Sequence, residues 1–191
     1  MINEKLLINS LQTFYGNQHN SDRLLSILNN ENNISLRSID WFITNYSKKH
    51  NIYYNIYKDK NDITVLDDKN KLISNINVFQ SYKSQLRAYS KKRFDPFCRR
   101  NRIQFKCYNE IIDTTIGQLN FFKWAINNLI VEYISIHKDK IEYDMNSCLK
   151  EMKLQGSIMK KEGKRKKRQE LSLSATRGLS RNSVIVRLEF D

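Results

Sequence analysis

Residues 90–100 read SKKRFDPFCRR and place five cationic side chains around an aspartate, a cysteine, two phenylalanines and the only proline of the chain. With its flanks, the range 83–102 holds eight lysines and arginines against one aspartate, a net charge of +7. Arginine donates paired hydrogen bonds to phosphate, and five arginines outnumber three lysines here in a lysine-rich chain. This basic segment (residues 83–102) is therefore predicted to bind a polyanion. The predicted contacts are Lys83, Arg87, Lys91, Lys92, Arg93, Arg99, Arg100 and Arg102.

A second run of cations lies at 160–168, where seven lysines and arginines accompany one glutamate, a net charge of +6. The two runs together account for the net charge of +13, so the rest of the chain is neutral. Such a dense run suits phosphate contact without sequence specificity, or a nuclear-localisation signal, and the sequence leaves both open. The predicted contacts of this tail cluster are Lys164, Arg165, Lys166, Lys167 and Arg168.

Four aromatic residues, Tyr82, Tyr89, Phe94 and Phe97, interleave with the cations of the basic segment. Aromatic rings can stack on nucleic-acid bases. Next to a proline, however, we expect Phe94 and Phe97 to be core anchors of a turn. A partner protein with an acidic surface would contact the same cations, so nucleic acid and acidic protein remain alternative partners.

The FDPF sequence at 94–97 predicts a rigid corner, because proline fixes its own backbone and disfavours helix at the residue before it. Asp95 is expected either to cap a helix that begins at Pro96 or to pair with Arg99 four residues on. Cys98 is expected to be buried.

Metal binding is disfavoured by the cysteine spacing. Cys98, Cys107 and Cys148 form no close pair of the C-x2-C kind that structural zinc sites use. We therefore predict no metal and no cofactor.

The residues VLDDK at 65–69 carry Asp67 and Lys69 in an order faintly like that of metal-dependent nucleases. Such enzymes need further carboxylates around a divalent ion, and nothing in the sequence brings one there, although Asp40 is a candidate. A hairpin turn accounts for the same residues more simply. Phosphate-binding glycine loops and the common hydrolase motifs are absent from the chain, which disfavours an enzyme.

The chain has 191 residues, 40% of them hydrophobic, with 5 glycines, which favours a single folded domain of helices with some strand. Periodicity predicts helices at 4–15, 21–29 (capped by Ser21), 35–48 (capped by Ser35), from Asn75 or Asn77 to about 90, and at 115–137 (capped by Thr114 or Thr115). A helix at 139–153 either follows separately or continues the previous one after a bend. Strands are expected at 51–58, at 102–108 and on both sides of a DDKN turn within 62–73. The fold class is thus α+β, with helices flanking a small antiparallel or mixed sheet.

The domain organisation expected is a globular part at 1–154, a basic flexible linker at 155–170 and a C-terminal segment at 171–191. The alternation of Val184, Val186, Leu188 and Phe190 predicts a strand that returns to the body. The longest apolar stretch, FFKWAINNLIVEYISI, is too polar to span a bilayer, and the start of the chain does not resemble a signal peptide. We expect an intracellular protein without a membrane partner.

Four stretches resemble an uncharacterised protein family of nucleocytoplasmic large DNA viruses, that is, giant viruses, iridoviruses and relatives. They are ISLRSIDWFITNYSKKHN (34–51), YKSQLRAYSKKRFDPFCRR (82–100), TTIGQLNFFKWAI (114–126) and the closing RKKRQELSLSATRGLSRNSVIVRLEFD (165–191). The resemblance implies a viral protein of the infected cell, in the nucleus or a cytoplasmic virus factory or packaged in the virion. It supplies no catalytic residues.

These observations predict a non-enzymatic viral protein that binds the phosphate backbone of DNA or RNA in genome handling, late transcription or packaging. The alternative is a virion assembly or adaptor protein with acidic partners, such as transcription or capsid proteins. A metal-dependent nuclease is the third and least favoured reading.

Overall fold

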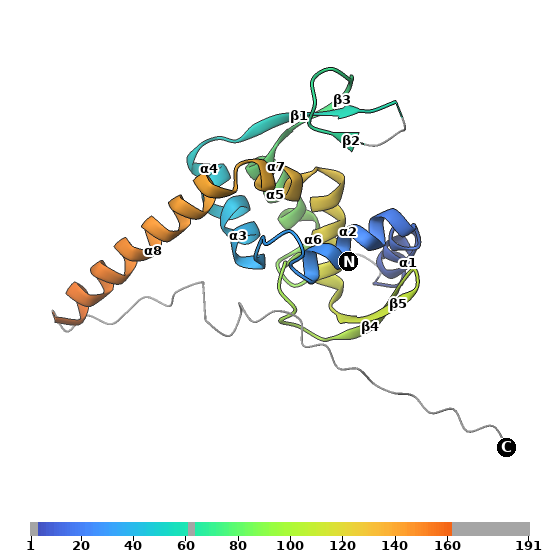
Figure 1. Ribbon diagram of the computed structural model, residues 1–191. Helices are drawn as coiled ribbons and strands as arrows, with labels where there is room; N and C mark the ends of the chain where they lie inside the picture. Colours follow the sequence, from blue (N-terminus) through green and yellow to red (C-terminus); the bar gives the residue numbers. More distant parts are fainter. Residues whose placement is uncertain (1–3, 61–63, 162–191) are drawn as a thin grey trace.

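Helix α6 (Ile116–Asn127) runs through the middle of the fold, and nearly all of its residues are buried. A helix that is apolar on all sides must be covered by other elements on all sides. The computed structural model describes residues 4–60 and 64–161, and it shows helices around α6 with two small antiparallel sheets at opposite edges (Figure 1). The predicted α+β class is confirmed. Of the two predicted caps, Thr114 and Thr115, it is Thr115 that caps α6, since its side-chain oxygen accepts a hydrogen bond from the Gln118 amide at 3.1 Å.

The N-terminal helices pack against α6. Helix α1 (Glu4–Tyr15) matches its predicted range and buries Leu7 and Leu11. Helix α2 (Gln18–Leu28) begins before the predicted Ser21, and Asn17 is its N-cap. The Ser21 hydroxyl instead donates to the Tyr15 carbonyl at 2.5 Å inside the core, so the prediction of a Ser21 cap was wrong.

The helix predicted at 35–48 is divided into three pieces. Helix α3 (Leu36–Trp41) has the predicted Ser35 cap, the π-helical turn η1 (Phe42–Tyr46) follows, and α4 (Ser47–Lys49) ends the segment. The hydroxyls of Thr44 and Ser47 donate to the carbonyls four residues earlier at 2.7 Å. Such side-chain bonds compete with the regular helical ladder, which is a local reason for the widened turn.

A three-stranded antiparallel sheet forms one edge of the molecule, with strand order β2-β1-β3. The strands are β1 (Tyr53–Lys58), β2 (Thr64–Val65) and β3 (Lys71–Asn77). Strands on both sides of the DDKN turn were predicted, but β2 and β3 do not pair with each other. Both pair with β1, which lies between them.

Helix α5 (Val78–Tyr89) begins directly after β3. Of the two predicted starts, Asn75 and Asn77, it is Asn77 that caps the helix, because its side chain accepts from the Gln80 amide at 3.1 Å. The second sheet is a hairpin of β4 (Ile103–Cys107) and β5 (Glu110–Thr114). Strand β4 was predicted and β5 was not. The turn between them contains Tyr108 at φ 43°, in the left-handed region. Tyrosine seldom adopts this conformation, so its presence in the sequence did not predict a turn.

The helix predicted at 115–137 breaks at Leu129, which has a left-handed φ of 51°. Helix α6 ends at Asn127, and α7 (Ile130–Ile136) starts after the break. Leu129 itself is buried, so the change of direction places an apolar side chain in the core. Periodicity alone does not register such a break, since the apolar spacing continues through it.

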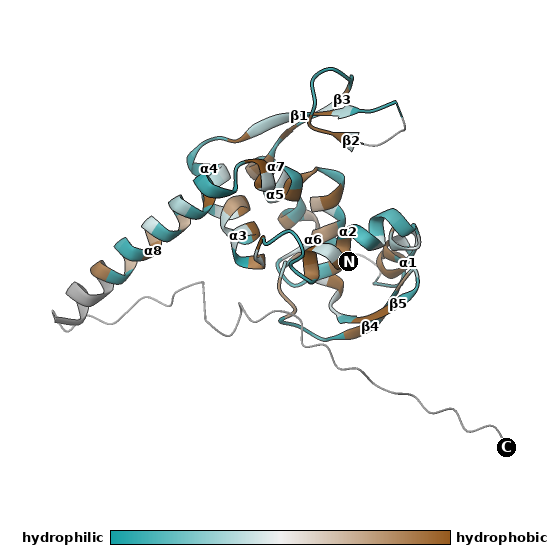
Figure 2. Cartoon of the chain, viewed as in Figure 1, coloured by the Kyte–Doolittle hydropathy of each residue, from teal (hydrophilic) through white to brown (hydrophobic). Residues whose placement is uncertain are grey.

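Helix α8 (Lys138–Lys161) is longer than predicted and continues past residue 153. Its first turns bury Ile141 and Met145 against the body, after which it projects away (Figure 1). Along it, hydrophobic and hydrophilic residues alternate in Figure 2, in contrast to the mostly hydrophobic centre. The C-terminal strand expected at 184–190, and the linker beyond Lys161, lie outside the described residues. Within the described part of the chain, no helix combines the length and the apolar character that a membrane span requires.

Candidate nucleic-acid interface

Hydrogen bonds to the backbone of the basic segment hold it on the N-terminal half of α6. The Asp95 amide donates to the Gly117 carbonyl at 3.2 Å, and the Gln118 side chain donates to the Pro96 carbonyl at 2.9 Å. The approach is close enough that a Cβ atom on Gly117 would lie 3.1 Å from the Lys92 carbonyl oxygen. The segment is therefore fixed in position and not a free loop.

Phe94 and Phe97 are buried, as predicted for core anchors. The Phe94 ring packs against Phe121 and Trp124 of α6, with ring centroids 5.2 and 5.6 Å apart, and stacks on Tyr89 at 6.2 Å. Since these rings are committed to the core, Phe94 and Phe97 do not present faces for stacking on bases.

Asp95 closes the corner with its side chain. No helix begins at Pro96, so the capping alternative was wrong, and Asp95 Oδ1 instead accepts from the Phe97 amide at 3.2 Å. The pairing alternative is present: Arg99 Nε lies 3.0 Å from Asp95 Oδ2, and Arg99 Nη2 lies 2.8 Å from Asp95 Oδ1. The Arg99 guanidinium also lies over the Phe97 ring, 4.5 Å from its centroid. Both arms of the Arg99 fork are thus engaged within the protein.

Two more predicted arginines pair with acids. Arg93 Nη2 lies 3.3 Å from Glu4 Oε2, and Arg102 Nη1 lies 3.3 Å from Asp113 Oδ2. Three of the five arginines in the basic segment are therefore partly neutralised. Exposed pairs of this kind are weak and can exchange partners.

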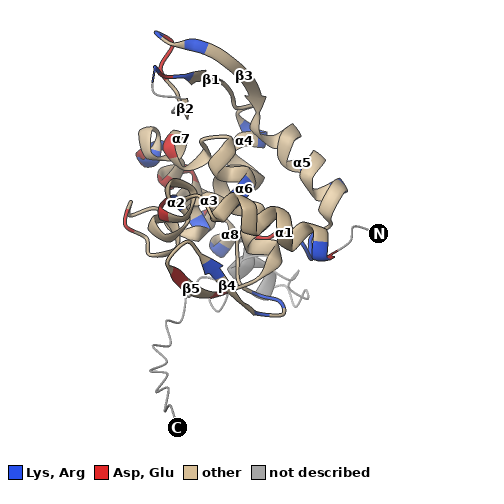
Figure 3. Cartoon of the chain, turned by 90° about the vertical axis from the view of Figure 1, so that its right-hand side faces the viewer, with Lys and Arg blue, Asp and Glu red and all other residues tan. Residues whose placement is uncertain are grey.

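The other predicted cations are exposed and make no ion pair with the residues that the structure describes. They are Lys83, Arg87, Lys91, Lys92 and Arg100. Lys83 Nζ lies over the Phe79 ring, 5.3 Å from its centroid. Figure 3 shows lysine and arginine segments at the end of α5, near the N-terminus, and along the loop that leads into β4.

Lys92, Arg93 and Arg100 come together around a shallow hollow of about 320 Å³. We call it the basic hollow; Glu4, Asn101, Thr115, Ile116 and Gly117 complete its lining. Three cations against one carboxylate leave it with a net positive charge. The sequence placed these residues in one segment, but the turn at FDPF decides that 92–93 and 100 face the same space.

The predicted contacts of the tail cluster, Lys164, Arg165, Lys166, Lys167 and Arg168, lie outside the described residues. The structure therefore does not relate them to the basic hollow.

The cysteines and Asp67 are accounted for by burial and by a turn. Cys98, expected to be buried, is half-buried, and Cys107 is buried. Burial raises the pKa of Cys107 to about 11, which keeps its thiol protonated near neutral pH. Across residues 4–60 and 64–161, no group of three metal-ligand side chains is found. Asp67 Oδ1 accepts from the Lys69 amide at 3.1 Å, as expected for a turn.

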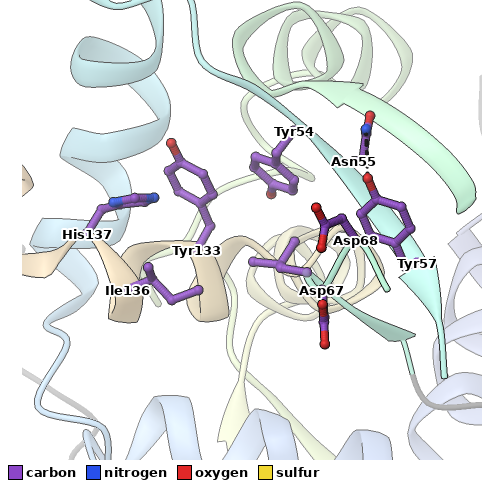
Figure 4. A pocket seen from close by; sticks show the side chains of 9 residues that line it. Tyr54, Asn55, Tyr57, Asp67, Asp68, Tyr133, Ile136 and His137 are labelled. Carbon is purple, nitrogen blue, oxygen red and sulfur yellow. Dashed lines mark hydrogen bonds between the residues drawn. The ribbon is translucent and has the colours of Figure 1, made fainter. Parts of the chain in front are cut away.

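A second hollow, of about 630 Å³, was not predicted from the sequence. We call it the tyrosine cleft. It lies between the three-stranded sheet and α7, and Figure 4 shows the side chains that line it. They are Tyr54, Asn55, Tyr57, Leu66, Asp67, Asp68, Tyr133, Ile136 and His137. The aromatic run at 51–58 was a signal for a strand, and nothing in it indicated that α7 would face it.

A match to a known protein family extends over residues 2–177. The chain belongs to the family of unknown function DUF7197. It is also similar to the uncharacterised protein L507 of Acanthamoeba polyphaga mimivirus, with 43% identity over 136 residues. That region is 68% of this chain and 48% of L507, so the chain spans about half the length of this curated relative. No solved structure matches the chain.

The similarity to a mimivirus protein supports the part of the predicted resemblance that concerns giant viruses. It also supports the expectation of a viral protein that is present in infected cells. The family description and the name of the relative assign no activity.

Proposed function

We propose that the protein is a non-enzymatic viral protein that binds the phosphate backbone of nucleic acid through the basic hollow and the exposed cations beside it. Its place would be genome handling, late transcription or packaging, in the nucleus, a virus factory or the virion. We also infer that the family extends beyond giant viruses to other nucleocytoplasmic large DNA viruses, iridoviruses included.

One observation carries the proposal: Lys92, Arg93 and Arg100 surround one hollow whose backbone is fixed on α6. With the backbone held, binding orders less of the chain than it would in a free loop, and each neutralised phosphate releases counterions. Without exposed aromatic platforms at Phe94 and Phe97, we expect binding with little sequence preference.

A second candidate is an assembly or adaptor protein that binds an acidic partner. The observation in its favour is the Glu4 carboxylate, which lines the basic hollow and lies 3.3 Å from Arg93. A carboxylate from another protein could occupy the same place. Partners that remain bound after nuclease treatment would favour this candidate over nucleic-acid binding.

The test is retention of the full chain on DNA and RNA as salt increases, compared with the variant Lys91→Glu/Lys92→Glu/Arg100→Glu. These three cations are exposed and make no ion pair with described residues, so their reversal leaves the Arg93, Arg99 and Arg102 pairs intact. Loss of three phosphate contacts should reduce the slope of log K against log salt by about 2.7.

The matched control is Lys69→Glu/Lys106→Glu/Lys150→Glu, which makes the same change in net charge at exposed positions outside the basic segment. If binding depends only on net charge, both variants will weaken it equally. Equal weakening, or unchanged binding in the first variant with its fold intact, would refute the proposed interface.

A further inference from the structure

The tyrosine cleft is built from three segments that are far apart in the chain. Strand β1 contributes Tyr54 and Tyr57, the residues after β2 contribute Asp67 and Asp68, and α7 contributes Tyr133. Its volume of about 630 Å³ lies in the range of small-ligand pockets, enough for one or two long side chains. It is separate from the basic hollow, since the two share no lining residue.

Its aromatic walls are held in place by hydrogen bonds and stacking. The Tyr54 and Tyr133 rings stack with centroids 4.6 Å apart and planes inclined by 14°. The Tyr54 hydroxyl donates to the Asn128 carbonyl at 2.6 Å, and the Tyr57 hydroxyl accepts from Asn55 at 3.0 Å. A ligand would therefore meet preorganised rings, which reduces the entropy lost on binding.

The charge of the cleft is negative. Asp67 and Asp68 are exposed, and neither forms an ion pair with any residue that the structure describes. Figure 4 shows Asp68 between Tyr54 and Tyr57, with Asp67 pointing away from the rings. No lysine or arginine lines the cleft. Burial and the charge of Lys140 lower the pKa of His137, so this ring is neutral at physiological pH.

We propose that the tyrosine cleft binds an arginine or lysine side chain of a basic peptide segment from another protein chain. Aromatic faces attract cations through their quadrupole, and Arg and Lys also have the length to reach a carboxylate at the rim. Asp68 supplies that carboxylate beside Tyr54 and Tyr57. This proposal does not depend on nucleic-acid binding at the basic hollow.

If the tail cluster supplies the segment, it must be the tail cluster of another chain, because that of the same chain is out of reach. Helix α8 begins beside the cleft, next to His137, and its 24 residues extend about 36 Å at 1.5 Å per residue. The seven residues from Lys161 to Arg168 span at most about 25 Å when fully extended. The tail cluster of a second copy has no such limit, and its charge complements Asp67 and Asp68.

The experiment measures binding of a fluorescent peptide with the sequence of residues 160–170, KKEGKRKKRQE, to the full chain by anisotropy. The variant Asp67→Asn/Asp68→Asn should weaken binding roughly tenfold, with Asp68→Asn contributing more than Asp67→Asn. Asparagine at 67 keeps the side-chain oxygen that accepts from the Lys69 amide, so the turn is preserved. Tyr57→Leu should weaken binding and Tyr57→Phe should not, since phenylalanine retains the ring.

The matched control is Asp22→Asn/Glu110→Gln, which removes two exposed acids outside the cleft. Sedimentation of the unlabelled chain identifies the source: self-association that the cleft variant abolishes would support the second copy as the partner. The proposal is overturned if the peptide does not bind, if the control weakens binding as much, or if spermidine binds the cleft and the peptide does not.

Discussion

The basic hollow and the tyrosine cleft differ in charge, in origin and in how they are held. The basic hollow takes its cations from one continuous segment, which is anchored on α6 through the buried ring of Phe94. The tyrosine cleft takes its rings and acids from three distant segments, and its walls are partly exposed. One molecule thus carries two hollows suited to ligands of opposite charge.

The difference shows that residue type alone does not identify the binding groups. Arg99 and Arg100 are neighbours in sequence, yet Arg99 is held by Asp95 while Arg100 lines the basic hollow. On β1, Tyr53 is largely exposed and lies outside the cleft lining, whereas the next residue, Tyr54, lines the cleft and donates a hydrogen bond to Asn128. In both regions the local backbone decides which of two neighbours is structural. Three substitution pairs test this comparison.

The largest effect is expected at the anchor of the basic hollow. Phe94→Ala removes a ring that is 2% exposed and packs against four other aromatic rings of α5 and α6. We expect the free energy of unfolding to fall by about 3–5 kcal/mol, measured by urea denaturation. Tyr57→Ala, in the wall of the cleft, should cost less than about 1 kcal/mol because its ring is half-buried. Equal losses in the free energy of unfolding would contradict the view that Phe94 is a buried anchor and Tyr57 a half-buried wall residue.

The next effect concerns two carboxylates that pair with arginines. Asp95→Ala leaves the Phe97 amide and the Arg99 fork without their acceptor, in a corner where Asp95 is 8% exposed. Since Arg99 is itself partly exposed, we expect a loss of about 1–2 kcal/mol. Asp113→Ala, which breaks the exposed pair with Arg102, should change stability by less than about 0.5 kcal/mol. A loss as large for Asp113 as for Asp95 would contradict the distinction between these pairs.

The smallest effect separates neighbouring tyrosines at the cleft. Tyr54→Phe removes the hydroxyl that donates to Asn128 and leaves that carbonyl without this donor, at a cost of about 1 kcal/mol. Tyr53→Phe removes an exposed hydroxyl and should leave stability unchanged. Thermal unfolding of both variants is the measurement. A null result for Tyr54→Phe would mean that its hydroxyl does not hold the cleft wall.

Several elements could be predicted because their signals are local. The caps Ser35, Asn77 and Thr115 precede apolar periodic stretches, and all three accept the expected backbone hydrogen bond. The burial of Phe94 and Phe97 followed from their place beside Pro96. By contrast, the π-helical turn at 42–46 and the break at Leu129 were not predicted, because the apolar spacing continues through both.

The sequence by itself determined the α+β class, most helix starts, the rigid corner and the concentration of positive charge in residues 83–102. These follow from backbone preferences and composition, which act over a few residues. Only the tertiary structure decided which cations pair within the protein, because Glu4 and Asp113 reach Arg93 and Arg102 from other elements. It alone brought β1, the turn after β2 and α7 together as the tyrosine cleft, since contacts between distant segments depend on how the whole core packs.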